Sequence, residues 1–119
     1  MTELTQEELA GYEAKCLELA KKYNVLKVYP YVGIDPNTDE RVVGYLKEPG
    51  YVQKLYAMDK IASIGPFMAG EELRDALTLK EESDERTYSE MPIYDEFKIG
   101  MATECITLIK AIQNSFKKK

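Results

Sequence analysis

The feature that most constrains the fold is an abrupt change of residue pattern over residues 25–47. The runs VLKVYPYVGI and RVVGYLK are rich in β-branched and aromatic residues, and the turn-forming residues DPNTDE separate them. This pattern predicts a β-hairpin over 25–47 with a six-residue loop. Pro30 has no amide hydrogen to donate to a neighbouring strand, so it indicates an edge strand or a bulge.

Residues 1–24, which precede the hairpin, have the pattern of a helix. Thr5 and Glu8 have the spacing of a capping box, in which the two residues bind amides that the first helical turn leaves free. Asn24 is expected to end this helix in the left-handed conformation. Apolar residues recur at steps of three and four, at Leu9, Tyr12, Cys16, Leu19 and Tyr23. This stripe fits either the core or a coiled-coil-like contact with another subunit, and its short length favours the core.

The chain after the hairpin alternates helical patterns with one acidic stretch. A helical hairpin is predicted over 50–78, broken at Gly65, with Pro66 in the first turn of its second helix. An exposed acidic loop is predicted over 79–94, and an apolar C-terminal helix over 95–117. With the helix in 1–24 and the hairpin over 25–47, these elements predict a single domain, 1–119, of the α+β class. One face of the first helix of the helical hairpin carries Val52, Leu55, Tyr56 and Ile61.

The charge of the chain is concentrated in one segment. The whole chain has 16 Lys and Arg against 21 Asp and Glu, a net charge of −5. Residues 71–96 contain ten acidic and three basic residues, so the rest of the chain is slightly basic. The overall sign argues against nucleic acid as a partner, because nucleic-acid binding needs a cationic surface. The candidate acidic surface consists of Glu81, Glu82, Asp84 and Glu85.

Residue types needed for many catalytic and metal sites are missing. The chain has no histidine, which is the commonest general base and metal ligand. Asp35, Asn37 and Asp39 match the opening of a calcium-binding EF-hand loop, but Glu40 and Leu46 stand where that loop needs glycine and glutamate. The sequence therefore predicts a non-enzymatic protein with no catalytic residues, no metal site and no cofactor.

The cysteines and the N-terminal residues bear on where the protein works. Cys16 and Cys105 both lie in apolar helical patterns, so we expect small buried hydrophobic residues. The opening residues MTELTQEELA carry acids where a signal peptide has bases, and no apolar stretch is long enough to span a membrane. We therefore expect a cytoplasmic protein with no membrane partner.

Several of the nine tyrosines fall close together in the sequence. Tyr29, Tyr31 and Tyr45 lie on the predicted hairpin, and Tyr51 and Tyr56 lie on the helix after it. This arrangement fits either a platform for stacking bases or a set of core and protein-interface residues. Few basic residues flank these tyrosines, which favours core and interface.

Residues 42–112 resemble a known family. The segments VVGYLKEPGYVQKLYAMDKIA, PFMAGEELRDALTL and EFKIGMATECITLIKAI, with an acidic loop before the last, are similar to the small tail assembly chaperones of tailed bacteriophages. In that family a strand ending in an aromatic residue, a lysine and a proline, here Tyr45, Lys47 and Pro49, leads into a short helical hairpin. The other matching positions are Ala69, Glu72, Leu73, Asp95, Glu96 and Phe97.

The resemblance implies a non-enzymatic role in the host-cell cytoplasm. Several copies of such a chaperone coat apolar segments of the tape-measure protein and deliver it to tail-tube subunits, so a protein partner and a homo-oligomer are expected. The alternative is an acidic inhibitor that mimics nucleic acid and presents the acidic surface to a host defence protein. The residues predicted to bind the chaperone's partner are Tyr29, Tyr31, Tyr45, Tyr51, Ile106, Ile109 and Phe116.

Overall fold

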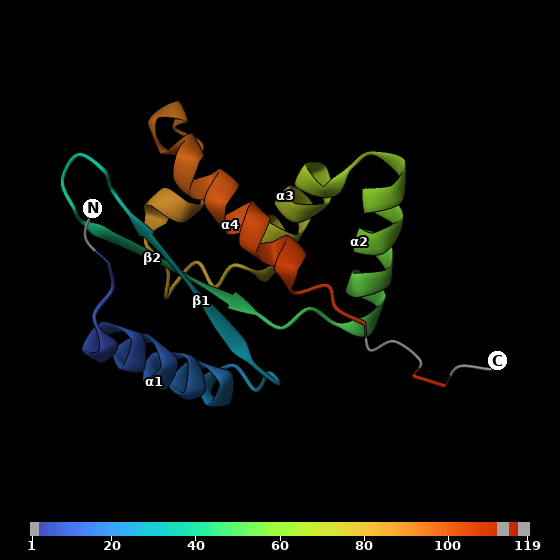
Figure 1. Cartoon of the computed structure of the whole chain (residues 1–119), viewed down its shortest axis with the longest axis horizontal. Helices are drawn as coiled ribbons and strands as arrows, with labels where there is room; N and C mark the ends of the chain where they lie inside the picture. Colours follow the sequence, from blue (N-terminus) through green and yellow to red (C-terminus); the bar gives the residue numbers. More distant parts are fainter. Residues whose placement is uncertain (1–2, 112–114, 117–119) are drawn as a thin grey trace.

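The computed structural model describes residues 3–111 and 115–116. Within these residues the elements are α1 (Gln6–Lys22), β1 (Val28–Ile34), β2 (Arg41–Lys47), α2 (Tyr51–Ser63), α3 (Pro66–Leu77) and α4 (Asp95–Thr107). Two short 3₁₀ helices, Glu85–Thr87 and Pro92–Tyr94, lie between α3 and α4. Figure 1 shows α1 on one side of the β-hairpin and α3 and α4 on the other. The predicted α+β class is confirmed.

Helix α1 begins and ends as its sequence predicts. The Glu8 amide donates to Thr5 Oγ1 at 3.1 Å and the Thr5 amide donates to Glu8 Oε1 at 2.9 Å, which completes the capping box. Asn24 follows the helix with a φ of 53°, in the left-handed region. The buried side chains of α1, Cys16 and Leu19, pack against the hairpin. The apolar stripe of α1 therefore faces the core of its own chain.

The β-hairpin is also confirmed, and its register assigns each side chain to one of two faces. The strands β1 and β2 pair antiparallel, with Val28 opposite Lys47 at one end and the loop 35–40 at the other. Because neighbouring side chains of a strand point to opposite faces, Leu46 packs with α3 and α4 while Tyr45 packs with α1. The sheet has two strands, so Pro30 lies on an edge strand, as predicted.

The hairpin separates two hydrophobic clusters. Both are needed because the two-stranded sheet has an apolar face on each side, and each face must be covered. The cluster on the side of α3 and α4 contains Leu46, Ala57, Leu73, Leu77, Met101, Cys105 and Leu108. The cluster on the side of α1 contains Cys16, Leu19, Val28, Tyr45 and Leu79.

The segment 79–94 is a loop with two short 3₁₀ turns, as predicted, but it is not exposed throughout, because part of it packs on β2. The Leu79 amide donates to the Tyr45 carbonyl at 2.9 Å, and the Asp84 amide donates to the Val43 carbonyl at 2.8 Å. The Leu79 side chain is buried. The backbone groups on the outer edge of β2 need hydrogen-bond partners, and a polar segment without periodicity can supply them from its own backbone.

The C-terminal helix is shorter than the predicted 95–117. Helix α4 ends at Thr107, where the amides of Leu108 and Ile109 donate to the carbonyls three residues before them, at 3.1 Å. Hydrogen bonds to the third residue before are those of a 3₁₀ turn, which is frequent at the C-terminus of an α-helix. The rest of the predicted helix includes residues 112–114, which lie outside the described residues together with the lysine tail 117–119.

Two glycines provide a matched test of the packing of α3 on α4. A Cβ added at Gly70 would lie 2.4 Å from the Ala102 carbonyl oxygen, whereas one added at Gly11 would meet nothing within 4 Å. We expect Gly70→Ala to lower the free energy of unfolding by about 1–3 kcal/mol, because the backbone of α4 must move. We expect Gly11→Ala to raise it by about 0.5–1 kcal/mol, because alanine restricts the unfolded chain. Urea unfolding of both variants measures this difference, and equal effects would contradict the close contact.

Candidate functional site

Helix α2 lies at the periphery of the fold and packs on α3. It begins at Tyr51, where the Gly50 amide donates to Gln53 Oε1 at 2.8 Å. Its one buried side chain, Ala57, joins the cluster that contains Leu73 of α3. Because α3 lies between α2 and the rest of that cluster, most apolar side chains of α2 find no core to cover.

Large apolar side chains therefore stay exposed on α2, on the turn after it and on the first turn of α3. Their exposed fractions range from 43% to 76%. We call this set the hairpin apolar surface, after the helical hairpin of α2 and α3 that carries it: Tyr51, Val52, Leu55, Tyr56, Met58, Ile64, Phe67 and Met68. Exposed apolar residues gathered on one supersecondary element are typical of a surface that contacts another protein.

Part of the hairpin apolar surface forms a row along α2. Tyr51, Leu55 and Met58 are separated by four and three residues, a spacing that places them along one side of a helix. Ala57 lies on a different side, toward α3. A row with this spacing suits contact with a second helix, whose side chains can fit between those of the row.

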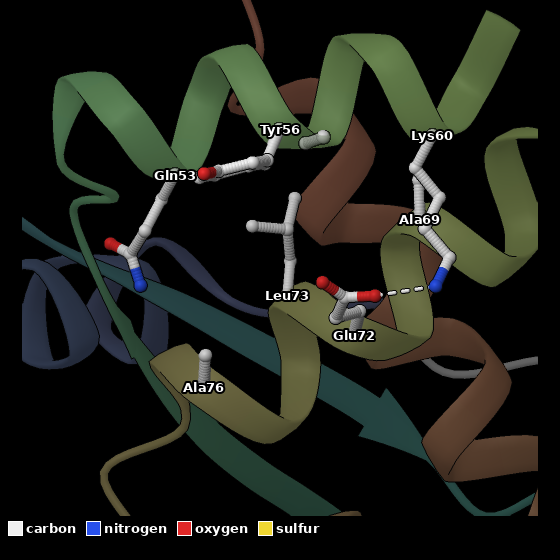
Figure 2. A pocket seen from close by; sticks show the side chains of 8 residues that line it. Gln53, Tyr56, Lys60, Ala69, Glu72, Leu73 and Ala76 are labelled. Carbon is white, nitrogen blue, oxygen red and sulfur yellow. Dashed lines mark hydrogen bonds and ion pairs between the residues drawn. The ribbon is translucent and has the colours of Figure 1, made fainter.

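A shallow groove of about 110 Å³ runs between α2 and α3 (Figure 2). Gln53 and Tyr56 line it from α2, and the Leu73 side chain points toward α2 from α3. Lys60 Nζ lies 2.6 Å from Glu72 Oε2, and this ion pair joins the two helices beside the groove. The groove thus offers an apolar depression beside the exposed Tyr56 ring, with a size that suits a single apolar side chain.

A second hollow, of about 250 Å³, lies between α3 and α4. Phe67 and Ile99 are its large apolar side chains and are 69% and 58% exposed. Lys98 Nζ, also at this hollow, lies 3.1 Å from Asp95 Oδ1. Phe67 belongs to the hairpin apolar surface, so exposed apolar side chains extend from α2 across the start of α3 to α4.

The tyrosines of the β-hairpin do not form the predicted binding surface. Tyr45 is 6% exposed and packs in the cluster beside α1. Tyr29 and Tyr31 are half-buried on the opposite face, against the cluster of α3 and α4. Burial, together with a hydrogen bond from its hydroxyl to Glu48, raises the pKa of Tyr29 to about 12. The alternation of side chains along the strands separates these tyrosines, so they contribute to the core on both faces.

The other predicted partner-binding residues are dispersed. Tyr51 is 76% exposed and belongs to the hairpin apolar surface. Ile106 and Ile109 are half-buried, and Ile109 packs against the cluster of α3 and α4. Phe116 is 78% exposed and lies beyond the end of α4. The sequence interpretation missed the rest of the hairpin apolar surface, although one signal was available, since apolar residues surround α2 on several sides.

The predicted acidic surface is partly neutralised by the fold. Glu82 accepts hydrogen bonds from Lys22 Nζ at 2.6 Å and from the Tyr23 hydroxyl at 2.8 Å. Asp84 Oδ2 lies 2.7 Å from a guanidinium nitrogen of Arg86. These two carboxylates serve internal contacts, so they are poorly placed to imitate phosphates. The two that remain exposed are Glu81 and Glu85.

The shifted pKa values of the carboxyl and thiol groups favour their ordinary charge states. The pKa of each shifted carboxyl group is lowered: by hydrogen bonds for Glu8, Glu71, Glu82 and Asp84, and for Glu48 by hydrogen bonds that outweigh its burial. Cys16 and Cys105 are buried and unpaired, as predicted, and burial raises the pKa of their thiols to about 11 and about 12. These carboxylates therefore remain anions, and these thiols remain protonated, near neutral pH.

In residues 3–111 and 115–116, no three or more acidic or cysteine side chains are grouped so that they could hold a metal ion. In the same part of the chain, each helix is too short or too polar to cross a lipid bilayer.

Comparison of the chain with protein-family models, with curated proteins and with solved structures gives no match.

The contacts of Glu82 predict how stability depends on pH. The hydrogen bond from Lys22, followed by that from Tyr23, lowers the pKa of Glu82 below its ordinary 4.5. The stabilisation is therefore present above pH 4.5 and is lost as the pH falls through the lower, folded-state pKa. We expect Glu82→Gln to reduce stability at pH 7 and to weaken the loss of stability in acid. The exposed Glu81→Gln variant is the control, and urea unfolding between neutral and acid pH measures both; identical pH profiles would contradict the prediction.

Proposed function

We propose that this chain is a non-enzymatic binding protein that holds apolar segments of a partner protein. The observation that carries the proposal is the hairpin apolar surface, whose members are 43% to 76% exposed. Burying a large apolar side chain is favourable by roughly 1.5–3 kcal/mol relative to leaving it in water. A partner that covers several of these side chains therefore gains substantial free energy without any rearrangement of the fold.

The shape of the surface favours a helical segment as the ligand. The row of Tyr51, Leu55 and Met58 on α2 matches the spacing by which an amphipathic helix presents its own apolar residues. The groove beside Tyr56 then accepts one apolar side chain of the bound segment. The partner is thus an amphipathic or apolar helix, of a kind that would aggregate if left uncovered.

The charge of the chain supports a holding role. The net charge of −5 makes loaded complexes repel one another, which opposes aggregation. Exposed acids such as Glu81 and Glu85 lie outside the hairpin apolar surface, so they do not hinder the approach of an apolar segment. An apolar binding surface on an acidic body is what a protein that keeps another chain dispersed requires.

The resemblance of residues 42–112 suggests which partner this is. In a tail assembly chaperone, the bound segments belong to the tape-measure protein, and the complex forms in the cytoplasm of the host cell before tail-tube subunits polymerise. The proposed test is co-expression of this chain with a tape-measure fragment, followed by size-exclusion chromatography. We expect the fragment to co-elute and to stay in solution. A fragment that aggregates as it does alone, with no co-elution, would refute the proposal.

Substitutions on the hairpin apolar surface should weaken this binding without unfolding the protein. Leu55→Asp and Phe67→Asp place a charge among side chains that are exposed in the free protein, so the fold is retained. Each change is expected to weaken binding by at least about tenfold, which corresponds to about 1.4 kcal/mol. The control is Ile93→Asp, because Ile93 is 74% exposed but lies outside this surface. Titration calorimetry measures the affinities, and an equal loss in the control would show that the surface is not specific.

A further inference from the structure

The backbone of β1 directs one set of hydrogen-bonding groups away from β2. Tyr45, on β2, donates its amide hydrogen to Ser83 Oγ at 2.9 Å and accepts at its carbonyl from Leu79, so both groups point away from β1. In an antiparallel pair, residues that bond across the ladder alternate with residues that bond outward. Pro30 lies opposite Tyr45, so Pro30 and Val32 both direct their backbone groups to the outer edge of β1. Ile34 does the same by this alternation.

Among the described residues, this outer edge of β1 is open, whereas the outer edge of β2 is covered at Tyr45 and Val43. Residues 79–84 bond to both outward groups of Tyr45 and to the Val43 carbonyl, but no backbone–backbone hydrogen bond joins the outward groups of Val32 or Ile34 to any described residue. Pro30 contributes a carbonyl to the same edge but no amide hydrogen. Over residues 30–34 the edge therefore offers donors at two positions and acceptors at three, and a partner backbone is the group that satisfies such a row.

An apolar groove runs beside the open edge. It has a volume of about 440 Å³ and lies between α1 and β1, with Leu17 and Ala20 on the helix side and Val28 and Pro30 on the strand side. Leu17 is 69% exposed, and Leu26, which also lines the groove, is 87% exposed. A strand added to β1 would send every second side chain into this groove, and those side chains should be apolar.

We propose that the open edge of β1 pairs with the same edge of a second copy of this chain, forming a four-stranded antiparallel sheet. The twofold axis passes beside Val32, and the two Val32 residues exchange amide-to-carbonyl hydrogen bonds. The Ile34 amide of each copy donates to the Pro30 carbonyl of the other. In this register every outward amide of Val32 and Ile34 is bonded, and the missing amide hydrogen of Pro30 removes a single bond per copy. The proposal does not depend on the proposed function, because it uses a different face.

The side chains of β1 are self-complementary in this register. Ile34 of the second copy stands opposite Pro30, where it enters the apolar groove beside Leu17. Val32 stands opposite Val32, and β-branched pairs of this kind favour strand pairing. The partner's side chains are thus apolar at each position that faces the groove, as the lining of the groove requires.

Charge complementarity supports the antiparallel orientation. Residue 27 comes opposite residue 37 of the second copy, so the exposed Lys27 lies beside the partner's loop 35–40. That loop contains Asp35, Asp39 and Glu40 and no basic residue. Asp39 and Glu40 pair with Arg41 and Arg86 of their own chain, so Asp35 is the acid that Lys27 would meet. Lys27 and Asp35 flank β1 on either side and are both odd-numbered. If the alternation of the strand continues to them, their side chains extend from the same face of the β-hairpin. A parallel pairing would instead set the two acidic loops side by side.

A proline substitution tests the backbone pairing. Val32→Pro removes the amide hydrogen at the twofold axis but no bond within the hairpin, because that amide points away from β2. Val32→Thr is the control, since it keeps both the amide and the β-branched shape. We expect sedimentation equilibrium to show a wild-type dimer that Val32→Thr preserves and that Val32→Pro weakens by at least about tenfold. Far-UV circular dichroism checks that the hairpin is intact in each variant.

A charge swap and a cross-link test the register without relying on proline. Lys27→Glu should weaken the dimer, and the double variant Lys27→Glu, Asp35→Lys should restore it. In the Val32→Cys variant, the two Cα atoms should lie about 5.5 Å apart, which a disulfide can bridge. Mild oxidation should therefore give a covalent dimer, while Val43→Cys, on the covered strand, should not. A wild-type protein that is monomeric at every concentration, or a dimer that none of these variants affects, would overturn the proposal.

Discussion

The hydrogen bonds between β2 and the segment that follows α3 hold the fold together. Tyr45 bonds both of its outward backbone groups to this segment, to Ser83 Oγ and to the Leu79 amide. Glu82, between these two residues, binds Lys22 near the end of α1. A two-stranded hairpin is marginally stable by itself. The two hydrophobic clusters attach it to α1 on one face and to α3 and α4 on the other, and the segment 79–84 adds hydrogen bonds to β2 and to the end of α1.

The same arrangement decides which surfaces remain open. Because the segment 79–84 bonds to Tyr45 and Val43 on the outer edge of β2, the edge that no described backbone pairs with is that of β1. Because α3 and α4 fill the core on their side of the sheet, α2 buries Ala57 and leaves most of its large apolar side chains in water. The molecule thus presents two different interaction surfaces. One is a helical face suited to an apolar segment, and the other is a strand edge suited to another strand.

Local patterns in the sequence were reliable where neighbouring residues decide the structure. The capping box of Thr5 and Glu8, the left-handed Asn24 and the hairpin over 25–47 were all predicted, since each follows from residues close together in the chain. The contact of residues 79–84 with β2 was not predicted, because the bonded residues of β2 lie more than thirty positions away in the sequence. The candidate site was predicted at Tyr51 alone, because periodicity shows which residues share a face of a helix but not which face is covered.

The sequence by itself determined the order and type of the elements, the concentration of acids in residues 71–96 and the absence of histidine. These properties depend on composition and short-range spacing. Only the tertiary structure decided that Glu82 and Asp84 bind internal cations, that Tyr45 is core and that Leu55 is exposed. The physical reason is that burial depends on competition. An apolar side chain is buried only if its helix or strand reaches a part of the core that no other element already fills. Which element fills which part is a property of the whole packed chain.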